Sequence, residues 1–174
     1  MNEFDPSSFV LAEKGRKFED FSVGQSFPHH WGRTFSEGDN ALFSTAMCYW
    51  TPLYLNAEFA RGHGHPSVVV NSMLVLCTVV GLSVEDLSES GGPFLGIEAC
   101  TFHLPVYPGD TVTASSVVRA KRDSASRHGY GIVTWRTEGR KQDGALVVDL
   151  VRTNLVQMRS REVVEHGTLR ANRI

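Results

Sequence analysis

The sequence predicts an α+β fold in which a curved antiparallel sheet wraps one central helix. The apolar run VVVNSMLVLCTVVGL at 68–82 is too short to span a bilayer and contains polar Asn71 and Ser72, so it indicates a buried helix. Segments rich in Val, Thr and aromatic residues follow it, separated by turn signals. A helix that is apolar on nearly every side needs cover, and an antiparallel meander provides it.

The composition fits one globular domain. The chain has 174 residues, of which 41% are apolar and 21% charged, and its net charge of −2 gives no reason to expect nucleic acid or a membrane as partner. The N-terminal segment has no apolar stretch flanked by basic residues, so we expect no secretory signal and a cytoplasmic protein. We expect a flexible extension at 1–17, a single domain at 18–160 and a polar tail at 161–174.

The segment before the central helix is expected to begin as an extended edge strand, because FSVGQSFPHHWGRTF at 21–35 mixes aromatic and polar residues around two glycines. Ser36 then begins a helix, since Asp39 follows three residues later as in a capping box. The apolar stripe of that helix is predicted to consist of Leu42, Phe43 and Ala46.

Two shorter signals lead from that helix to the central one. Pro52 is expected to break the first helix, and Asn56 to cap a short helix that ends at Gly62 or Gly64. The central helix is predicted at 70–81, with a glycine as its last residue.

The remainder of the chain is predicted to be strand. Pro-Gly-Asp, a polar loop and Gln-Asp-Gly mark the turns between consecutive segments. One helix followed by such a meander is the hot-dog arrangement. The predicted strands are 92–107, 110–123, 129–141 and 145–158.

Neither a metal nor a disulfide framework is expected. Cys48, Cys77 and Cys100 are odd in number and form no close pair. His29 and His30 lack further ligands at the spacing of a metal site. We therefore expect no metal and no cofactor.

Three stretches of the chain carry a resemblance to a known family. They are TPLYLNAEFA at 51–60, VVVNSMLVL at 68–76 and FHLPVYPGDTVTA at 102–114. In this order, they resemble the MaoC-like hydratases and dehydratases, which are related to (R)-specific enoyl-CoA hydratases, over residues 20–158. The segment SRHGYGIVTWRTEGRKQDG at 126–144 is similar to the branch that contains mesaconyl-CoA-type hydratases.

The resemblance implies a dimer of hot-dog subunits with an acyl-thioester tunnel at the interface, and addition of water across an enoyl thioester or its reverse. In the family an Asp and a His five residues apart move the protons, and a backbone N–H at the start of the central helix stabilises the thioester oxygen. Tyr49 occupies the Asp position, Thr51 a nearby Asn position and Tyr54 the His position. The glycine at the helix start is Ser72, whose N–H can still serve.

A tyrosine donates a proton or hydrogen bond readily but is a poor base near neutral pH, because its reference pKa is about 10. Tyr49 and Tyr54 are therefore candidate donors, and the base must come from elsewhere. His63 and His65 precede the central helix and are the candidates, with His65 preferred; the alternative is that both are loop histidines bonded to backbone or solvent.

The remaining site candidates are substrate-binding residues. Asn71 needs a hydrogen-bond partner beside an apolar helix, which is either a substrate carbonyl or a neighbouring loop. Trp50, Phe94 and Tyr107 are candidates to line the acyl tunnel; the alternative is that they belong to the core, as most aromatic residues do. The full set is Trp50, Thr51, Asn71, Ser72 and Phe94.

Three functions remain open from the sequence. The first is a hydratase or dehydratase that interconverts an enoyl thioester and a 3-hydroxyacyl thioester, linked to CoA or to acyl-carrier protein, and works as a homodimer or higher oligomer. The second is a thioesterase on the same fold. The third is a non-catalytic acyl-thioester-binding subunit that pairs with an active homologue.

Overall fold

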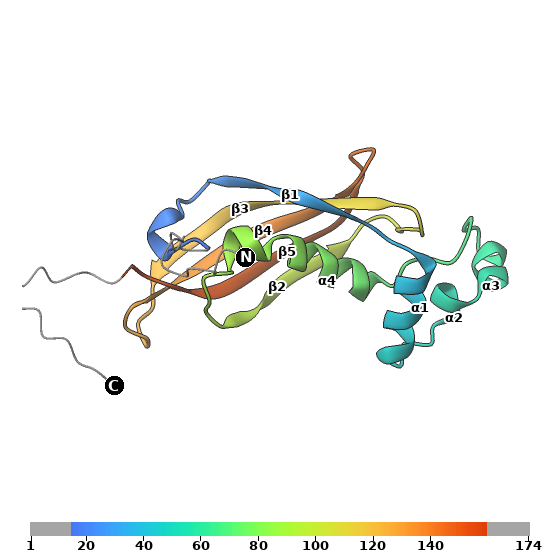
Figure 1. Cartoon of the computed structure of the whole chain (residues 1–174), viewed down its shortest axis with the longest axis horizontal. Helices are drawn as coiled ribbons and strands as arrows, with labels where there is room; N and C mark the ends of the chain where they lie inside the picture. Colours follow the sequence, from blue (N-terminus) through green and yellow to red (C-terminus); the bar gives the residue numbers. More distant parts are fainter. Residues whose placement is uncertain (1–14, 160–174) are drawn as a thin grey trace, which may run out of the picture.

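Five antiparallel strands form one curved sheet around a helix in a computed structural model that describes residues 15–159 (Figure 1). The expected tail at 161–174, and all but residues 15–17 of the expected extension, lie outside this range. The sheet order is β1-β3-β4-β5-β2, so β1 and β2 are its edges. The strands are β1 Ser26–Thr34, β2 Phe94–Phe102, β3 Thr111–Asp123, β4 Tyr130–Lys141 and β5 Leu146–Gln157.

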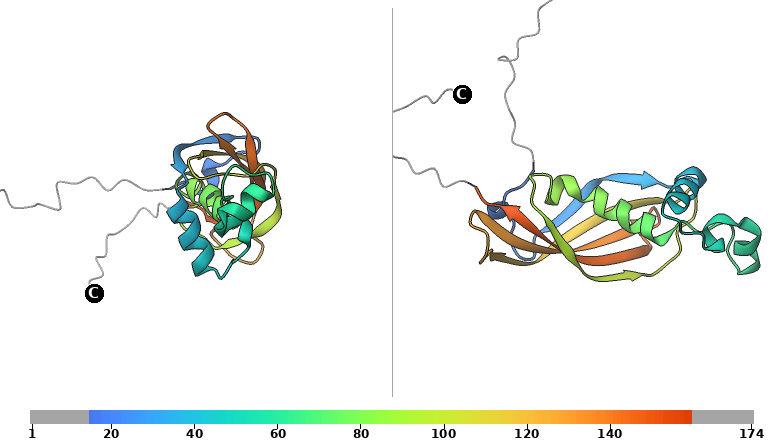
Figure 2. Two further views of the ribbon diagram at one scale, coloured as in Figure 1. Left: turned by 90° about the vertical axis from the view of Figure 1, so that its right-hand side faces the viewer. Right: turned by 90° about the horizontal axis from the view of Figure 1, so that it is seen from below.

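The central helix is α4, Ser72–Leu82, and it lies along the inner face of the sheet (Figure 2). It packs against β1, β3 and β4. A Cβ atom at Gly139 would stand 2.6 Å from the Val79 side chain, so a glycine is needed where the helix approaches β4. This is the predicted hot-dog fold. The other helices are η2 Phe18–Asp20, α1 Glu37–Ala46, α2 Pro52–Leu55, α3 Ala57–Gly62 and α5 Val84–Leu87.

The interior contains two apolar clusters. The first lies under α4 and the second near η2 and α5, where the Phe21 ring meets the Trp135 ring edge-on at 5.3 Å. Members of the first include Val70, Leu74, Val75, Val79, Val112, Val148 and Leu150, and members of the second include Phe18, Phe21, Phe27, Leu87, Val118, Val133 and Trp135.

A belt of hydrogen-bonded polar side chains separates the two clusters. His29 Nδ1 lies 2.7 Å from Asp86 Oδ2, and His29 Nε2 lies 2.8 Å from Ser116 Oγ. Ser116 Oγ is also 2.8 Å from Thr137 Oγ1. The belt thus links β1, α5, β3 and β4 through side chains that are hydrogen-bonded to one another.

Several predicted boundaries need correction. Pro52 does not end α1, which stops at Ala46; it is instead the first residue of α2, where its missing N–H costs nothing. α4 begins two residues later than predicted because Asn71 caps it. β2 stops at Phe102, since the proline-containing stretch after it crosses to the start of α4, where Val106 O accepts from Val70 N at 2.8 Å.

The stripe predicted for α1 is only partly confirmed. Phe43 packs against the first cluster, but Leu42 is 74% exposed and Ala46 is exposed, and the buried residues of the helix are Asn40 and Ser44. The inner side of α1 meets main-chain groups that require hydrogen bonds, so polar residues face inward there.

Part of the inner surface has no cover within residues 15–159. β2 is exposed along almost its whole length, including large apolar side chains. On the neighbouring helices, Met73 of α4 and Val84 of α5 are also exposed. We define the β2 face as Phe94, Leu95, Ile97 and Phe102.

No helix in the described range is both long and apolar enough to cross a membrane.

Candidate active site

The segment between β1 and α4 gathers at one end of the sheet, beside the N-terminus of α4. Figures 1 and 2 show α1, α2 and α3 projecting past the strands at this end. All four residues predicted to be catalytic lie in this projecting segment. The site is therefore built from local turns and short helices rather than from the sheet.

The start of α4 presents a free main-chain donor. Asn71 Oδ1 accepts from Met73 N at 2.9 Å, and Val75 N bonds to Asn71 O at 3.1 Å. No described residue accepts from the N–H of half-buried Ser72. Because the helix dipole is positive here, this N–H is placed to stabilise negative charge on an oxygen atom.

Asn40 and Asn71 fix the position of that helix start. Asn40 Oδ1 accepts from Asn71 N at 2.8 Å, and its Nδ2 donates to Tyr54 O at 2.9 Å and to Val69 O at 3.0 Å. Asn71 Nδ2 lies 3.2 Å from Ser44 Oγ. The Asn71 side chain thus bonds to Ser44 of α1 and to the main chain of its own helix, whereas the sequence predicted a substrate carbonyl or a neighbouring loop as its partner.

Tyr49 and Tyr54, the two tyrosines predicted to occupy the family's Asp and His positions, lie together. Their rings stack with centroids 5.7 Å apart and an angle of 30°. Tyr49 is 45% exposed and Tyr54 is half-buried. Cys48, just before Tyr49, has a φ of +54°, which turns the chain sharply out of α1. Both phenols are accessible to a ligand at this end of the sheet.

The two histidines have different surroundings. His63 ends α3, its Nδ1 lies 2.8 Å from Phe59 O, and its ring stacks on the Phe59 ring at 4.0 Å. His65 is half-buried, and its Nδ1 lies 2.9 Å from the Tyr107 hydroxyl. No described residue bonds to His65 Nε2. His65 therefore has an anchored ring with one available nitrogen.

Tyr107 belongs to a small charged group on the loop before β3. Lys141 Nζ lies 5.2 Å from the centre of the Tyr107 ring and 2.7 Å from Asp110 Oδ2. The Tyr107 main chain donates to Asp110 at 2.9 Å. Asp110 has a lowered pKa: burial opposes the shift, and the hydrogen bonds from Lys141, Tyr107 and Gln142 outweigh it. This group fixes Tyr107, which in turn holds His65.

The other predicted substrate-binding residues are not all brought together. Trp50 is 69% exposed, and exposed Thr51 precedes α2. Phe94 pairs with Asn154, whereas Phe102, at the other end of β2, pairs with Val148 near α4. Phe94 is thus far along the sheet from the tyrosine pair of its own chain.

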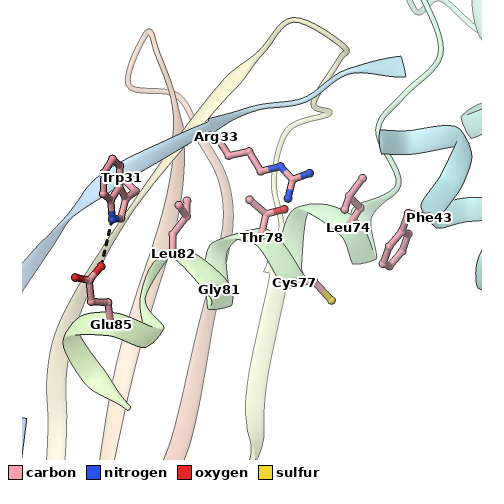
Figure 3. Close-up of a pocket in the computed structure, with 9 residues that line it drawn as sticks. All are labelled: Trp31, Arg33, Phe43, Leu74, Cys77, Thr78, Gly81, Leu82 and Glu85. Atoms are coloured by element: carbon pink, nitrogen blue, oxygen red, sulfur yellow. Dashed lines mark hydrogen bonds between the residues drawn. The ribbon is translucent and has the colours of Figure 1, made fainter. Parts of the chain in front are cut away.

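A groove of about 440 Å³ runs beside α4 on the β1 side (Figure 3). The guanidinium of Arg33 points toward Thr78 across it, and Arg33 also pairs with Asp39 at 3.0 Å. Trp31 Nε1 donates to Glu85 at 3.2 Å at the far end. None of the predicted site residues lines this groove.

Sequence reasoning missed the structural roles of Asn40, Ser44 and Tyr107. The spacing of Asn40 and Ser44, four residues apart, was a usable signal for one polar helix face. No spacing rule links Tyr107 to His65, 42 residues away in sequence. Among residues 15–159 no three His, Cys, Asp or Glu side chains are grouped as metal ligands.

A family model for mesaconyl-CoA hydratase matches residues 9–173. The chain belongs to this family. The mesaconyl-CoA hydratase of Haloarcula marismortui is 36% identical over 158 residues, which cover 90% of this chain and 44% of that protein. The chain thus spans less than half the length of the mesaconyl-CoA hydratases it matches.

Two further relatives are similar to this chain. The (R)-specific enoyl-CoA hydratase of Aeromonas caviae is 32% identical over 116 residues, covering 67% of this chain and 82% of that enzyme. A solved putative MaoC domain dehydratase from Chloroflexus aurantiacus superposes with a TM-score of 0.81 and 28% identity, covering 94% of this chain and 46% of that one. The (R)-specific enoyl-CoA hydratase is therefore matched over most of its length, whereas the mesaconyl-CoA hydratase and the Chloroflexus protein are matched over less than half of theirs.

Proposed function

We propose that this chain binds an acyl thioester at the start of α4 and interconverts an enoyl thioester and a 3-hydroxyacyl thioester. The observation that carries the proposal is the free N–H of Ser72 at a helix start held by Asn40 and Asn71. Family membership supports the same reaction, since its named relatives are hydratases of CoA thioesters.

In this proposal each group has one task. The Ser72 N–H binds the thioester oxygen, where charge develops when C2 becomes carbanion-like. Tyr49 and Tyr54 donate hydrogen bonds or a proton, and His65 Nε2 takes the proton from the attacking water. His63 serves only to end α3.

The β2 face supports assembly with a second hot-dog unit. A stable chain rarely leaves a row of large apolar side chains along an edge strand uncovered. In the proposed dimer the tunnel is completed at this interface, with the partner unit covering the β2 face and the exposed side of α4.

A second function is favoured by two specific observations. Both acid–base positions hold tyrosine, and the chain matches less than half of the mesaconyl-CoA hydratases. The chain would then be a non-catalytic acyl-thioester-binding subunit, and a partner unit would move the protons.

One assay separates these functions. The pure protein is incubated with a panel of enoyl-CoA and 3-hydroxyacyl-CoA esters, and the absorbance of the conjugated thioester is followed together with thiol release. Interconversion without thiol release is the expected result. Binding of the esters without turnover would assign the chain to the non-catalytic function, and thiol release would indicate a thioesterase.

A further inference from the structure

Arg152 is a buried cation without a described counter-ion. It lies on the inner face of β5, is 1% exposed, and its Nε and Nη2 atoms have no hydrogen-bond partner. Within residues 15–159 it forms no ion pair, and its guanidinium carbon lies over the Trp135 ring, 5.5 Å from the ring centre. Burial of a charge without a partner is costly, so something must compensate it.

The neighbours of Arg152 leave further polar atoms unsatisfied. Trp135 lies opposite Arg152 in the register of β4 and β5, and its buried indole N–H has no acceptor. Asn154 lies two residues along β5 on the same face, and its buried Oδ1 has no donor. Arg152 and Trp135, on adjacent strands, therefore have three buried nitrogen donors without acceptors.

The charged groups nearby do not neutralise Arg152. Asp86 faces this region from α5, but its Oδ2 is held by His29 at 2.7 Å. Burial lowers the pKa of His29, with the charge of Arg152 adding to the effect against the raising influence of Asp86. Burial also lowers the pKa of Arg152 to about 10, which still leaves the guanidinium protonated at neutral pH.

This region is separate from the proposed thioester site. Val79, in the second half of α4, lies beside Val148 of β5 at Gly139. Arg152 is four residues further along β5, about 13 Å away at about 3.3 Å per residue, in the direction away from the start of α4. A short acyl group bound at Ser72 does not extend this far.

We propose that a small anion, a halide or a compact oxyanion such as phosphate or a carboxylate, binds in the interior beside Arg152 and Trp135. The anion accepts from Arg152 Nε and Nη2 and from the Trp135 indole, and it supplies the missing negative charge. A buried water molecule accepts hydrogen bonds but brings no charge, so it satisfies the donors and leaves the cation uncompensated.

The test is thermal unfolding of the full chain at fixed ionic strength, with sodium gluconate replaced stepwise by sodium chloride, phosphate or acetate. Because the anion binds only the folded state, each tenfold rise in its concentration above the dissociation constant lowers the unfolding constant about tenfold. The three anions separate halide from phosphate and carboxylate binding. The expected result is a rise in Tm with at least one of them.

Two variants identify the site. Arg152→Met removes the buried charge and fills a similar volume, so it is expected to fold and to lose the anion-dependent rise in Tm. Arg119→Met, at an exposed position of β3, is the matched control and keeps the rise. The proposal is overturned if the wild-type Tm is indifferent to anion identity, which would mean buried water only, or if Arg152→Met keeps the dependence.

A second measurement does not depend on the folding of the variant. Crystals of the wild-type protein soaked in sodium bromide are expected to show an anomalous peak within hydrogen-bond distance of Arg152. If phosphate or acetate is the anion that raises Tm, it is expected as density at the same place. Ordered water alone beside Arg152 in both experiments contradicts the proposal.

Discussion

The two ends of the hot-dog domain satisfy their polar groups in different ways. At the end near η2 and α5, side chains from different strands bond to one another, as His29, Ser116 and Thr137 do. At the α1–α3 end, Asn40 bonds mainly to main-chain groups, and the rings of Tyr49 and Trp50 remain exposed. The first end keeps its polar groups away from solvent, the unpaired Arg152 and Trp135 included, whereas the second leaves donors and apolar surface exposed to a ligand or a partner.

The largest expected difference between the ends concerns packing. Phe21→Ala removes a 1% exposed ring from the second cluster and is expected to lower the free energy of unfolding by about 3–5 kcal/mol. Trp50→Ala, at the other end, is expected to change it by less than about 0.5 kcal/mol. Urea unfolding of both variants measures this contrast, and equal losses would contradict it.

The Asn40 contacts test whether buried hydrogen bonds hold the start of α4 at the α1–α3 end. Asn40→Ala leaves Asn71 N, Tyr54 O and Val69 O without their partner, so it is expected to cost about 2–3 kcal/mol. Asn56→Ala removes only the cap of α3 and is expected to cost about 1 kcal/mol. A cost for Asn40→Ala no larger than that for Asn56→Ala would show that these contacts do not hold the helix start.

The end near η2 and α5 is expected to make the free energy of unfolding depend on pH. Because the pKa of His29 in the folded state lies below its unfolded value, protonation favours unfolding. The contribution of His29 to the free energy of unfolding is complete above about pH 6.5 and is lost as the pH falls below that value. The free energy then changes by at most about 1.4 kcal/mol per pH unit. His29→Gln is expected to flatten this slope below about pH 6.5.

Exposed His128→Gln is the matched control and should leave the slope as it is in the wild type. The lowered pKa values of Asp20, Asp39 and Asp110 act in a more acidic range, so they do not obscure the comparison. An unchanged slope in His29→Gln would show that the belt is not the acid-sensitive element.

The sequence was sufficient for the fold because its strongest signals are local. The capping pair Ser36 and Asp39, the Asn56 cap and the apolar run of α4 all form as predicted. The contacts that build the site are long-range, such as Asn40 with Asn71 and His65 with Tyr107, and no periodicity encodes them. The sequence predicted Tyr49 and Tyr54 as site residues, but it did not predict that their rings stack.

Comparison of His65 with His63 tests the central claim most directly. If His65 supplies the base, His65→Ala is expected to lower kcat/KM for hydration of an enoyl-CoA by roughly 10²–10⁴-fold, the usual contribution of a general base. His63→Ala, two residues away at the exposed end of α3, is expected to stay within about threefold of the wild type, a change of less than about 1 kcal/mol. Equal rates for the two variants, with the substrate still bound, would contradict the account, because His65 would then not supply the base.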